Sequence, residues 1–303
     1  MSPARRATLL LLATTVLWGS SFFTMSWGTR GIALHLGSGA APSAFLFLRF
    51  LASAVIQVAI FPSLLKDLTG PLVRAGVTLS LPFYAGFFLQ ATGLVSSTST
   101  VVAFLTSLFV VITPLVGRLF FREIVASSTL VGAFISLGGV YVMTDPSVGL
   151  GRGELLSIAC AVAFAFQIQM TNVVTRHHRP EAISFVQFCC AVIYSGITLA
   201  ALGVNPGNLL RSLGERHVAW TVLYGAAACS VIAMGVLNRY QREISATRAS
   251  VIYMIEPVFA ALFAALLAGE SMTARKILGG AVILIGNLAC ELMGRQTPEE
   301  KMA

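Results

Sequence analysis

The feature that most constrains this chain is a succession of ten apolar stretches, each about 20 residues long, separated by short segments that carry most of the charge. A helix of that length crosses the hydrocarbon core of a bilayer, and a helix satisfies its own backbone polar groups there. The leucine, alanine and valine runs lack the short alternating strands of a membrane β-barrel. We therefore predict an all-α membrane protein with ten transmembrane helices, at residues 7–27, 42–62, 75–94, 98–118, 125–144, 154–174, 182–203, 217–237, 249–268 and 274–293.

Composition argues against a large water-facing domain. Of the 303 residues, 56% are hydrophobic and 11% are charged, and the mean hydropathy is +0.85. The first 21 residues, with Arg5 and Arg6 before an apolar run, resemble a secretory signal peptide. Because that run is long and further spans follow, we expect an uncleaved first helix. The expected partners are the lipid bilayer and a small-molecule substrate.

Positive charge is distributed unevenly between the two sets of loops. If the N-terminus is inside, cytoplasmic segments hold thirteen Lys and Arg residues and external ones hold six. Cytoplasmic loops retain positive charge, so we predict a multi-pass protein of the cytoplasmic membrane with both termini cytoplasmic. The net charge of +8 then faces anionic headgroups, and no nucleic-acid partner is expected. The inner set is Arg5, Arg6, Lys66, Arg74, Arg118, Arg122, Arg176, Arg179, Arg239, Arg242, Arg248, Arg295 and Lys301; the outer set is Arg30, Arg152, Arg211, Arg216, Arg275 and Lys276.

The two halves of the chain resemble each other. A shift of 147 residues pairs Glu123 with Glu270, Gly132 with Gly279 and Gly139 with Gly286. A different offset places Arg49 opposite Gln187. Since five spans per half is an odd number, the second half enters the membrane from the opposite side. We predict two inverted five-helix repeats, residues 1–147 and 148–303, with a substrate site between them near the midplane.

A set of short motifs falls in order along the spans. The motifs are Trp18-Gly19-Ser20-Ser21-Phe22, Leu48-Arg49-Phe50, Glu256-Pro257 and Ala268-Gly269-Glu270, together with the glycine-bearing last span of each half. This pattern resembles the EamA-type branch of the drug/metabolite transporter superfamily over nearly the whole chain. The resemblance implies ten helices as two inverted repeats around a central cavity. It also implies export of amino acids, other small metabolites or drugs.

Two prolines are candidates for helix breaks or gating. Pro257 lies 13 residues before Glu270, whereas Pro114 lies 9 residues before Glu123. The proline of the first half is therefore displaced by about one helical turn. Equivalent roles for the two prolines do not follow from the repeat.

Glu256 is the clearest candidate for a functional side chain. It lies roughly 12 to 15 Å from the inner end of its span, hence near the midplane. Pro257 leaves the carbonyl of Tyr253 without its usual donor, and Tyr253 shares a helix face with Glu256. The carboxylate could bind a cationic group or carry a proton; the alternative is a structural partner of another buried group.

Arg49 lies roughly 10 Å from the outer edge of the second span. Its side chain could snorkel to the interface, because helical side chains lean toward the N-terminus. It could instead face the cavity and meet a substrate carboxylate or an acidic side chain, because a lipid-facing arginine at this depth is costly. Gln187, also polar, occupies the matching position of the second half.

The remaining candidates are hydroxyls, amides and aromatic rings. Polar groups in membrane helices most often bond a neighbouring helix, and aromatic rings most often pack, so for each of them packing competes with a place in the cavity. The polar candidates are Ser21, Gln90, Ser99, Thr106, Thr113, Gln169, Asn172 and Asn238, and the aromatic ones are Trp18, Phe22, Tyr84, Phe87 and Phe88.

Several classes of function lack their sequence signatures. The five cysteines lie in apolar spans without a C-x-x-C, so we expect neither a disulfide nor a metal framework. The sequence has no P-loop, no H-E-x-x-H and no G-x-S-x-G, and we expect no cofactor. We therefore predict a metabolite exporter, with amino acids as the first substrate class, acting by alternating access as a facilitator or proton antiporter. Drug efflux is the alternative within transport, and a membrane-embedded enzyme is the alternative outside it.

Overall fold

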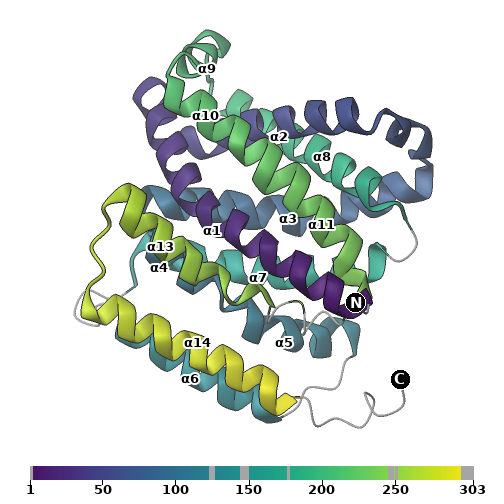
Figure 1. The fold of residues 1–303 in the computed structure, drawn as a ribbon. Helices are drawn as coiled ribbons and strands as arrows, with labels where there is room; N and C mark the ends of the chain where they lie inside the picture. Colours follow the sequence, from purple (N-terminus) through teal and green to yellow (C-terminus); the bar gives the residue numbers. More distant parts are fainter. Residues whose placement is uncertain are drawn as a thin grey trace.

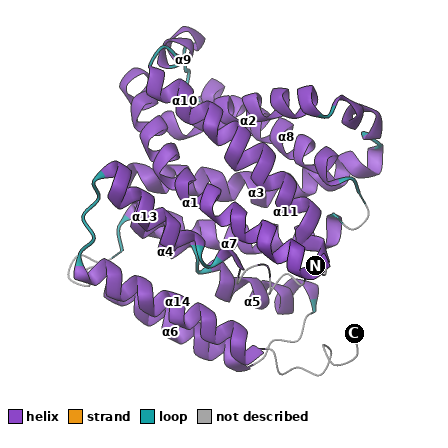
Figure 2. Ribbon diagram, viewed as in Figure 1, coloured by secondary structure: helices purple, strands orange, loops and turns teal. Residues whose placement is uncertain are grey.

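The computed structural model describes residues 3–122, 127–143, 150–175, 178–244, 249 and 252–294, and all regular structure in these ranges is helical (Figure 2). The predicted all-α class is confirmed. Helices from the two halves of the sequence interleave in one bundle (Figure 1). Contacts between α3 and α7 and between α2 and α8 join the halves.

The first half begins with the long helix α1 and contains an interrupted helix near its end. Its elements are α1 (Pro3–Leu36), α2 (Ala41–Ile60), the short 3-10 helix η1 (Pro62–Asp67), α3 (Gly70–Ser96), α4 (Ser99–Thr106), α5 (Phe109–Phe121) and α6 (Ser127–Met143).

The second half contains a π-helical segment, η2, between two α-helices. Its elements are α7 (Arg152–Val174), α8 (Pro180–Ala201), α9 (Pro206–Ser212), α10 (Arg216–Tyr224), η2 (Gly225–Ile232), α11 (Ala233–Tyr240), the 3-10 turn η3 (Gln241–Glu243), α13 (Glu256–Ala268) and α14 (Ala274–Gly294).

Seven helical stretches in the described part of the chain are long and apolar enough to cross a membrane. They correspond to the predicted spans one to four and six to eight, with α4 and α5 together forming one stretch and α10 to α11 another. The described apolar stretches around Phe134–Met143 and Glu256–Ala268 are shorter. The predicted count of ten spans therefore stays a prediction.

Corresponding helices of the two halves match at the shift of 147 residues. Both α5 and α13 contain 13 residues, and each follows a two-residue turn, at 107–108 and 254–255. Each also ends at a left-handed residue, Arg122 with φ 60° and Gly269 with φ 63°. These matched ends support the internal repeat. Glu123, which the shift pairs with Glu270, lies outside the described residues.

The two prolines occupy different places in these helices. Pro257 is the second residue of α13, where the missing N–H would have no helical acceptor. Pro114 lies inside α5, where it removes a backbone hydrogen bond. The displacement expected from the sequence is therefore present, and only Pro257 adjoins an interruption.

Helices α6 and α14 pack side by side along one edge of the bundle (Figure 1). Glycines make the contact: a Cβ added to Gly139 would lie 2.6 Å from the nitrogen of Ile283, and one added to Gly279 would lie 2.6 Å from the nitrogen of Met143. Small residues allow such backbone approach in membrane helices. Gly139 and Gly279 therefore allow the two helices to lie in close contact.

A network of ion pairs links the α2–α3 connection to the start of α8. The Arg179 guanidinium lies 2.6 Å from Asp67 Oδ2 and 3.4 Å from Glu181 Oε2, and Arg239 lies 3.4 Å from Glu181 Oε1. Gln57 Nε2 donates to the Glu181 carbonyl at 2.9 Å. The network ties both halves together at the end of the bundle that holds Lys66 and Arg179, the predicted cytoplasmic end.

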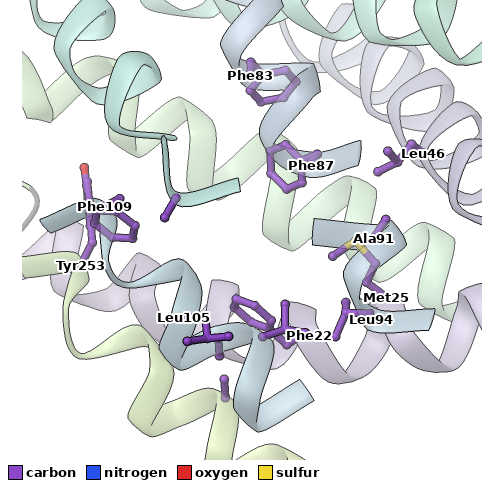
Figure 3. Packing of buried hydrophobic residues seen from close by; sticks show 14 of the residues in the cluster. Phe22, Met25, Leu46, Phe83, Phe87, Ala91, Leu94, Leu105, Phe109 and Tyr253 are labelled. Carbon is purple, nitrogen blue, oxygen red and sulfur yellow. The ribbon is translucent and has the colours of Figure 1, made fainter. Parts of the chain in front are cut away.

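The hydrophobic core contains side chains from several helices of both halves. Phe22 and Met25 of α1, Phe83 and Phe87 of α3, and Phe109 of α5 belong to it (Figure 3). The rings of Phe83 and Phe87 meet edge to face with centroids 5.0 Å apart. This packing fixes the aromatic side of the cavity described next.

Candidate functional site

A cavity with about 570 Å³ of empty space, counted with its opening, lies among helices from both halves. Its lining comes from α1, α3, α4, α5, α7, α11 and the chain around the turn at 254–255. The lining residues are Trp18, Ser21, Phe83, Phe87, Gln90, Thr106, Phe109, Phe164, Gln167, Ile168, Met234, Leu237, Tyr253 and Glu256.

Both helix interruptions border this cavity. Thr106 is the last residue of α4 and Phe109 is the first residue of α5, while Tyr253 and Glu256 flank the turn at 254–255. Interrupted helices in transporters expose backbone groups where they line a cavity instead of lipid. The two halves thus contribute corresponding segments to one site.

Glu256 is the one carboxylate in the cavity lining that the structure describes. Its side chain is partly exposed, and it has no hydrogen-bond or ion-pair partner among the described residues. The neighbouring Tyr253 is buried, and its hydroxyl donates to Gln241 Oε1 at 3.1 Å. The carboxylate is therefore available to a solute or a proton, whereas the tyrosine hydroxyl is engaged.

Three further polar side chains of the lining retain unused hydrogen-bonding capacity. Within the described ranges, neither the Ser21 hydroxyl nor the Gln90 amide has a hydrogen-bond partner, although both side chains are at least 97% buried. Gln167 Oε1 is also buried without a partner. Since buried polar groups are normally satisfied, such a cluster indicates space for a polar ligand or water.

Trp18 is held in the cavity wall by the π-helical segment η2. Its indole Nε1 donates to the Cys229 carbonyl at 3.1 Å, and its ring meets Tyr253 edge to face at 5.4 Å. Short π-helical segments occur often at functional sites. The orientation of Trp18 therefore depends on η2.

Arg49 is buried, with 1% of its surface exposed, and is not part of the cavity lining. Its Nε donates to Ser230 Oγ of η2 at 2.9 Å, and its guanidinium lies 4.9 Å from the Phe87 ring centroid and 5.5 Å from that of Phe50. Nη2 has no partner among the described residues. The side chain neither snorkels to the interface nor pairs with Glu256; it is enclosed by aromatic rings and the π-helix.

Several of the other predicted residues outside the lining have structural partners. Gln169 Nε2 donates to the Thr113 carbonyl at 3.2 Å, and Gln187 Oε1 accepts from Asn238 at 3.4 Å. The Tyr84 hydroxyl accepts from Ser195 at 3.3 Å. Phe22, with 1% of its surface exposed, lies in the core. These contacts explain why polar side chains in apolar spans do not all reach the cavity.

Most of the lining that sequence reasoning missed is apolar. Phe83, Phe109, Phe164, Met234 and Leu237 lie in apolar helices, where their periodicity matches that of ordinary packing. Gln167 was the one missed residue with a detectable signal, an amide in an apolar span two positions from Gln169. Phe87, expected as packing, packs on Phe50 and also lines the cavity.

Glu270 lies outside the cavity and anchors the start of α4. Its carboxylate accepts from the backbone nitrogens of Ser99 and Thr100 at 2.8 and 3.2 Å and from Thr100 Oγ1 at 2.9 Å. Burial alone would raise the pKa of Glu270, but these hydrogen bonds outweigh it and hold the pKa below its usual value. A loop of the second half therefore caps an interrupted helix of the first.

No group of three His, Cys, Asp or Glu side chains that could hold a metal ion occurs in the part of the chain that the structure describes. The polar groups of the lining are suited to binding a solute. They are one carboxylate, two amides and the hydroxyls of Ser21, Thr106 and Tyr253, and they lie among aromatic and aliphatic side chains. A fold of interleaved membrane helices around such a cavity defines a multi-pass membrane transporter.

Comparison with known proteins identifies the family. The model of the EamA-like transporter family matches residues 5–145 and, a second time, residues 151–289. The chain therefore belongs to the EamA-like transporter family, within the drug/metabolite transporter superfamily. The two matches agree with the internal repeat and confirm the family resemblance of the sequence motifs.

Two distant relatives match nearly the full chain. An "Uncharacterized transporter" of Archaeoglobus fulgidus is 25% identical over 290 residues, covering 94% of this chain and 86% of that protein. A "Probable amino-acid metabolite efflux pump" of Salmonella typhimurium is 23% identical over 296 residues, covering 93% of this chain and 94% of that protein. A solved structure titled "Crystal structure of protein" has a TM-score of 0.67 at 17% identity, covering 96% of this chain and 98% of that one, and so shares the fold.

Proposed function

We propose that this protein is a secondary transporter that exports small metabolites, amino acids being the first class to test, across the cytoplasmic membrane by alternating access. The observation that carries the proposal is the cavity at the two helix interruptions, lined by an unpaired carboxylate. Family membership supports transport, and the Salmonella relative supports an amino-acid-like substrate. Helix interruptions allow the segments on either side of the cavity to move separately.

We propose that Glu256 either binds the substrate or couples its transport to the movement of a proton. An ionised carboxylate without a partner in the described part of the chain attracts a cationic group of the substrate, and the same group can exchange a proton. In the first case the protein works as a facilitator, and in the second as a proton antiporter. Pro257, which begins α13 beside the turn, is the proposed pivot for movement of that helix.

We also propose the topology expected from the sequence. Ten helices form two inverted repeats, residues 1–147 and 148–303, with both termini cytoplasmic. The matched lengths and ends of α5 and α13 support the repeat. Single cysteines in both tails and beside Arg152, in a background without native cysteines, test the topology: an impermeant thiol reagent added outside should label the Arg152 loop alone. Labelling of a tail from outside contradicts ten spans.

Counterflow in proteoliposomes tests the function itself. Vesicles loaded with one candidate solute should accumulate the labelled solute from outside, and empty vesicles should not. The panel comprises amino acids, apolar amines and organic cations. The absence of counterflow with every solute, from protein shown to be folded, would contradict transport of these classes.

Drug efflux is the second candidate, and the aromatic lining favours it. Six of the lining residues carry aromatic rings, an environment suited to flat apolar compounds: Trp18, Phe83, Phe87, Phe109, Phe164 and Tyr253. Accumulation of dyes or antibiotics in counterflow, without accumulation of any metabolite, would support efflux of drugs over metabolite export.

A further inference from the structure

We propose that the cavity selects protonated amines with an apolar body and disfavours free amino acids, because the lining that the structure describes offers acceptors for an ammonium group and no cation for a carboxylate. The proposal rests on the proposed function in one respect, that the cavity is where the substrate binds. It narrows the substrate class from small metabolites in general to protonated amines that carry no carboxylate.

The one charged group of the described lining is an acceptor, Glu256, whereas the free donors, the Gln90 amide and the Ser21 hydroxyl, are neutral. Both oxygens of Glu256 lack partners among the described residues, and an ionised carboxylate only accepts. The orientation of the Gln167 side-chain amide follows from its contact with Thr171. The Thr171 hydroxyl donates its hydrogen to the backbone carbonyl of Gln167 at 2.7 Å. The same hydroxyl oxygen can therefore only accept from Gln167 Nε2, which lies 3.4 Å away. Gln167 Oε1 is thereby left as a buried acceptor without a donor.

An ammonium group supplies what these acceptors lack. It carries several N–H donors and a positive charge, whereas a neutral alcohol carries one donor and no charge. The aromatic rings favour the same ligand, because ring faces attract a desolvated cation and ring surfaces bury its apolar body. Trp18, with its indole nitrogen already engaged by Cys229, presents carbon surface to the cavity.

A free amino acid would bring a second charge for which the lining has no partner. No Lys, Arg or His occurs among the lining residues that the structure describes. The buried cation Arg49 lies over the ring of Phe87 and donates to Ser230, and it is not one of the lining residues. A carboxylate transferred from water into this cavity would lose its hydration beside Glu256, which repels it.

Isothermal titration calorimetry with the full-length protein in lipid nanodiscs tests the selection. The matched ligands are phenylalaninamide and phenylalanine at about pH 6, where both amines are protonated and only phenylalanine carries a carboxylate. We expect phenylalaninamide to bind about tenfold or more tightly than phenylalanine. Equal affinity, tighter binding of phenylalanine, or no binding of phenylalaninamide would overturn the proposal.

Two variants assign the effect to Glu256. Glu256→Gln should weaken phenylalaninamide binding by about tenfold or more, because the amide keeps the shape and loses the charge. Glu243→Gln, which removes an exposed carboxylate outside the lining, is the matched control and should leave affinity unchanged. Unchanged affinity for phenylalaninamide in folded Glu256→Gln overturns the proposal. If that variant does not fold, the comparison of phenylalaninamide with phenylalanine on the wild-type protein decides the proposal.

Failure of this proposal differs from failure of the proposed function. Binding and counterflow of phenylalanine, without preference for phenylalaninamide, would leave an amino-acid transporter and overturn the amine selection. Binding of phenylalaninamide without counterflow of any solute would support the amine site and contradict transport.

Discussion

Glu256 and Arg49 are both charged side chains within predicted spans, yet their surroundings differ. Glu256 lines the cavity and has no partner among the described residues, whereas Arg49 is enclosed by Phe50, Phe87 and Ser230. A costly group that is left unpaired at a cavity is placed for a ligand. Arg49 has one nitrogen, Nη2, without a partner among the described residues, but its guanidinium is enclosed by aromatic rings and Ser230, so we expect it to serve the fold. The comparison thus predicts different roles for two charged residues that the sequence put forward as cavity candidates.

The largest effect that we expect from this comparison is the loss of transport caused by Glu256→Gln. Gradient-driven flux should fall by about tenfold or more, since the variant neither titrates nor attracts a cation. The thermal unfolding midpoint should change little, because the carboxylate has no partner to lose among the described residues. Flux and unfolding are measured on the same purified protein, with Glu243→Gln as the control. Normal flux would show that Glu256 has no functional role, and loss of folded protein would show that its role is structural.

Arg49→Lys tests the other side of the comparison. Lysine keeps the charge but loses the Nε donor to Ser230 and the planar stacking on Phe87, so stability should fall by about 2 kcal/mol. Flux per folded molecule should stay near the wild-type value. If the lysine variant is as stable as wild type but transports poorly, Arg49 acts in the transport path and the distinction fails.

A substitution at a helix contact outside the cavity lining should change stability without removing any charged group. Gly139→Ala places a Cβ 2.6 Å from the Ile283 nitrogen, which should cost about 1 to 2 kcal/mol at the α6–α14 contact. Gly138→Ala is the matched control, because its Cβ would meet nothing within 4 Å. Unfolding curves of the two variants should differ, and equal stability would contradict the tight contact.

The smallest expected effect concerns Glu270, a carboxylate that has the partners Glu256 lacks. Its pKa is lowered, so its contribution is present above the unfolded value of 4.5 and is lost as pH falls through the folded value. Glu270→Gln should cost less than about 1 kcal/mol at neutral pH, since the group is half-buried and screened. The difference from wild type in unfolding should shrink below about pH 4. A difference that does not depend on pH would contradict the charged cap.

The sequence predicted the helical fold, seven of the spans and the internal repeat because apolar length and glycine spacing are local patterns. It did not predict the turn at 107–108, since Ser107 and Leu108 resemble ordinary span residues and Pro114 lies later, inside α5. Six predicted site residues line the cavity: Trp18, Ser21, Gln90, Thr106, Tyr253 and Glu256. The position of Arg49 could not be predicted, because it depends on packing against the π-helix of another span.

Cysteine labelling compares the two regions directly and tests whether the cavity around Glu256 receives the substrate. One protein carries Ser21→Cys as its single cysteine, in the cavity lining; the other keeps only Cys229, buried in η2 beside Ser230 and Arg49. Both are exposed to a small thiol reagent with and without phenylalaninamide. We predict that Ser21→Cys reacts and that the ligand slows its reaction severalfold, while Cys229 stays unreactive in both conditions. Rapid labelling of Cys229, or labelling of Ser21→Cys at a rate that the ligand does not change, would contradict the account.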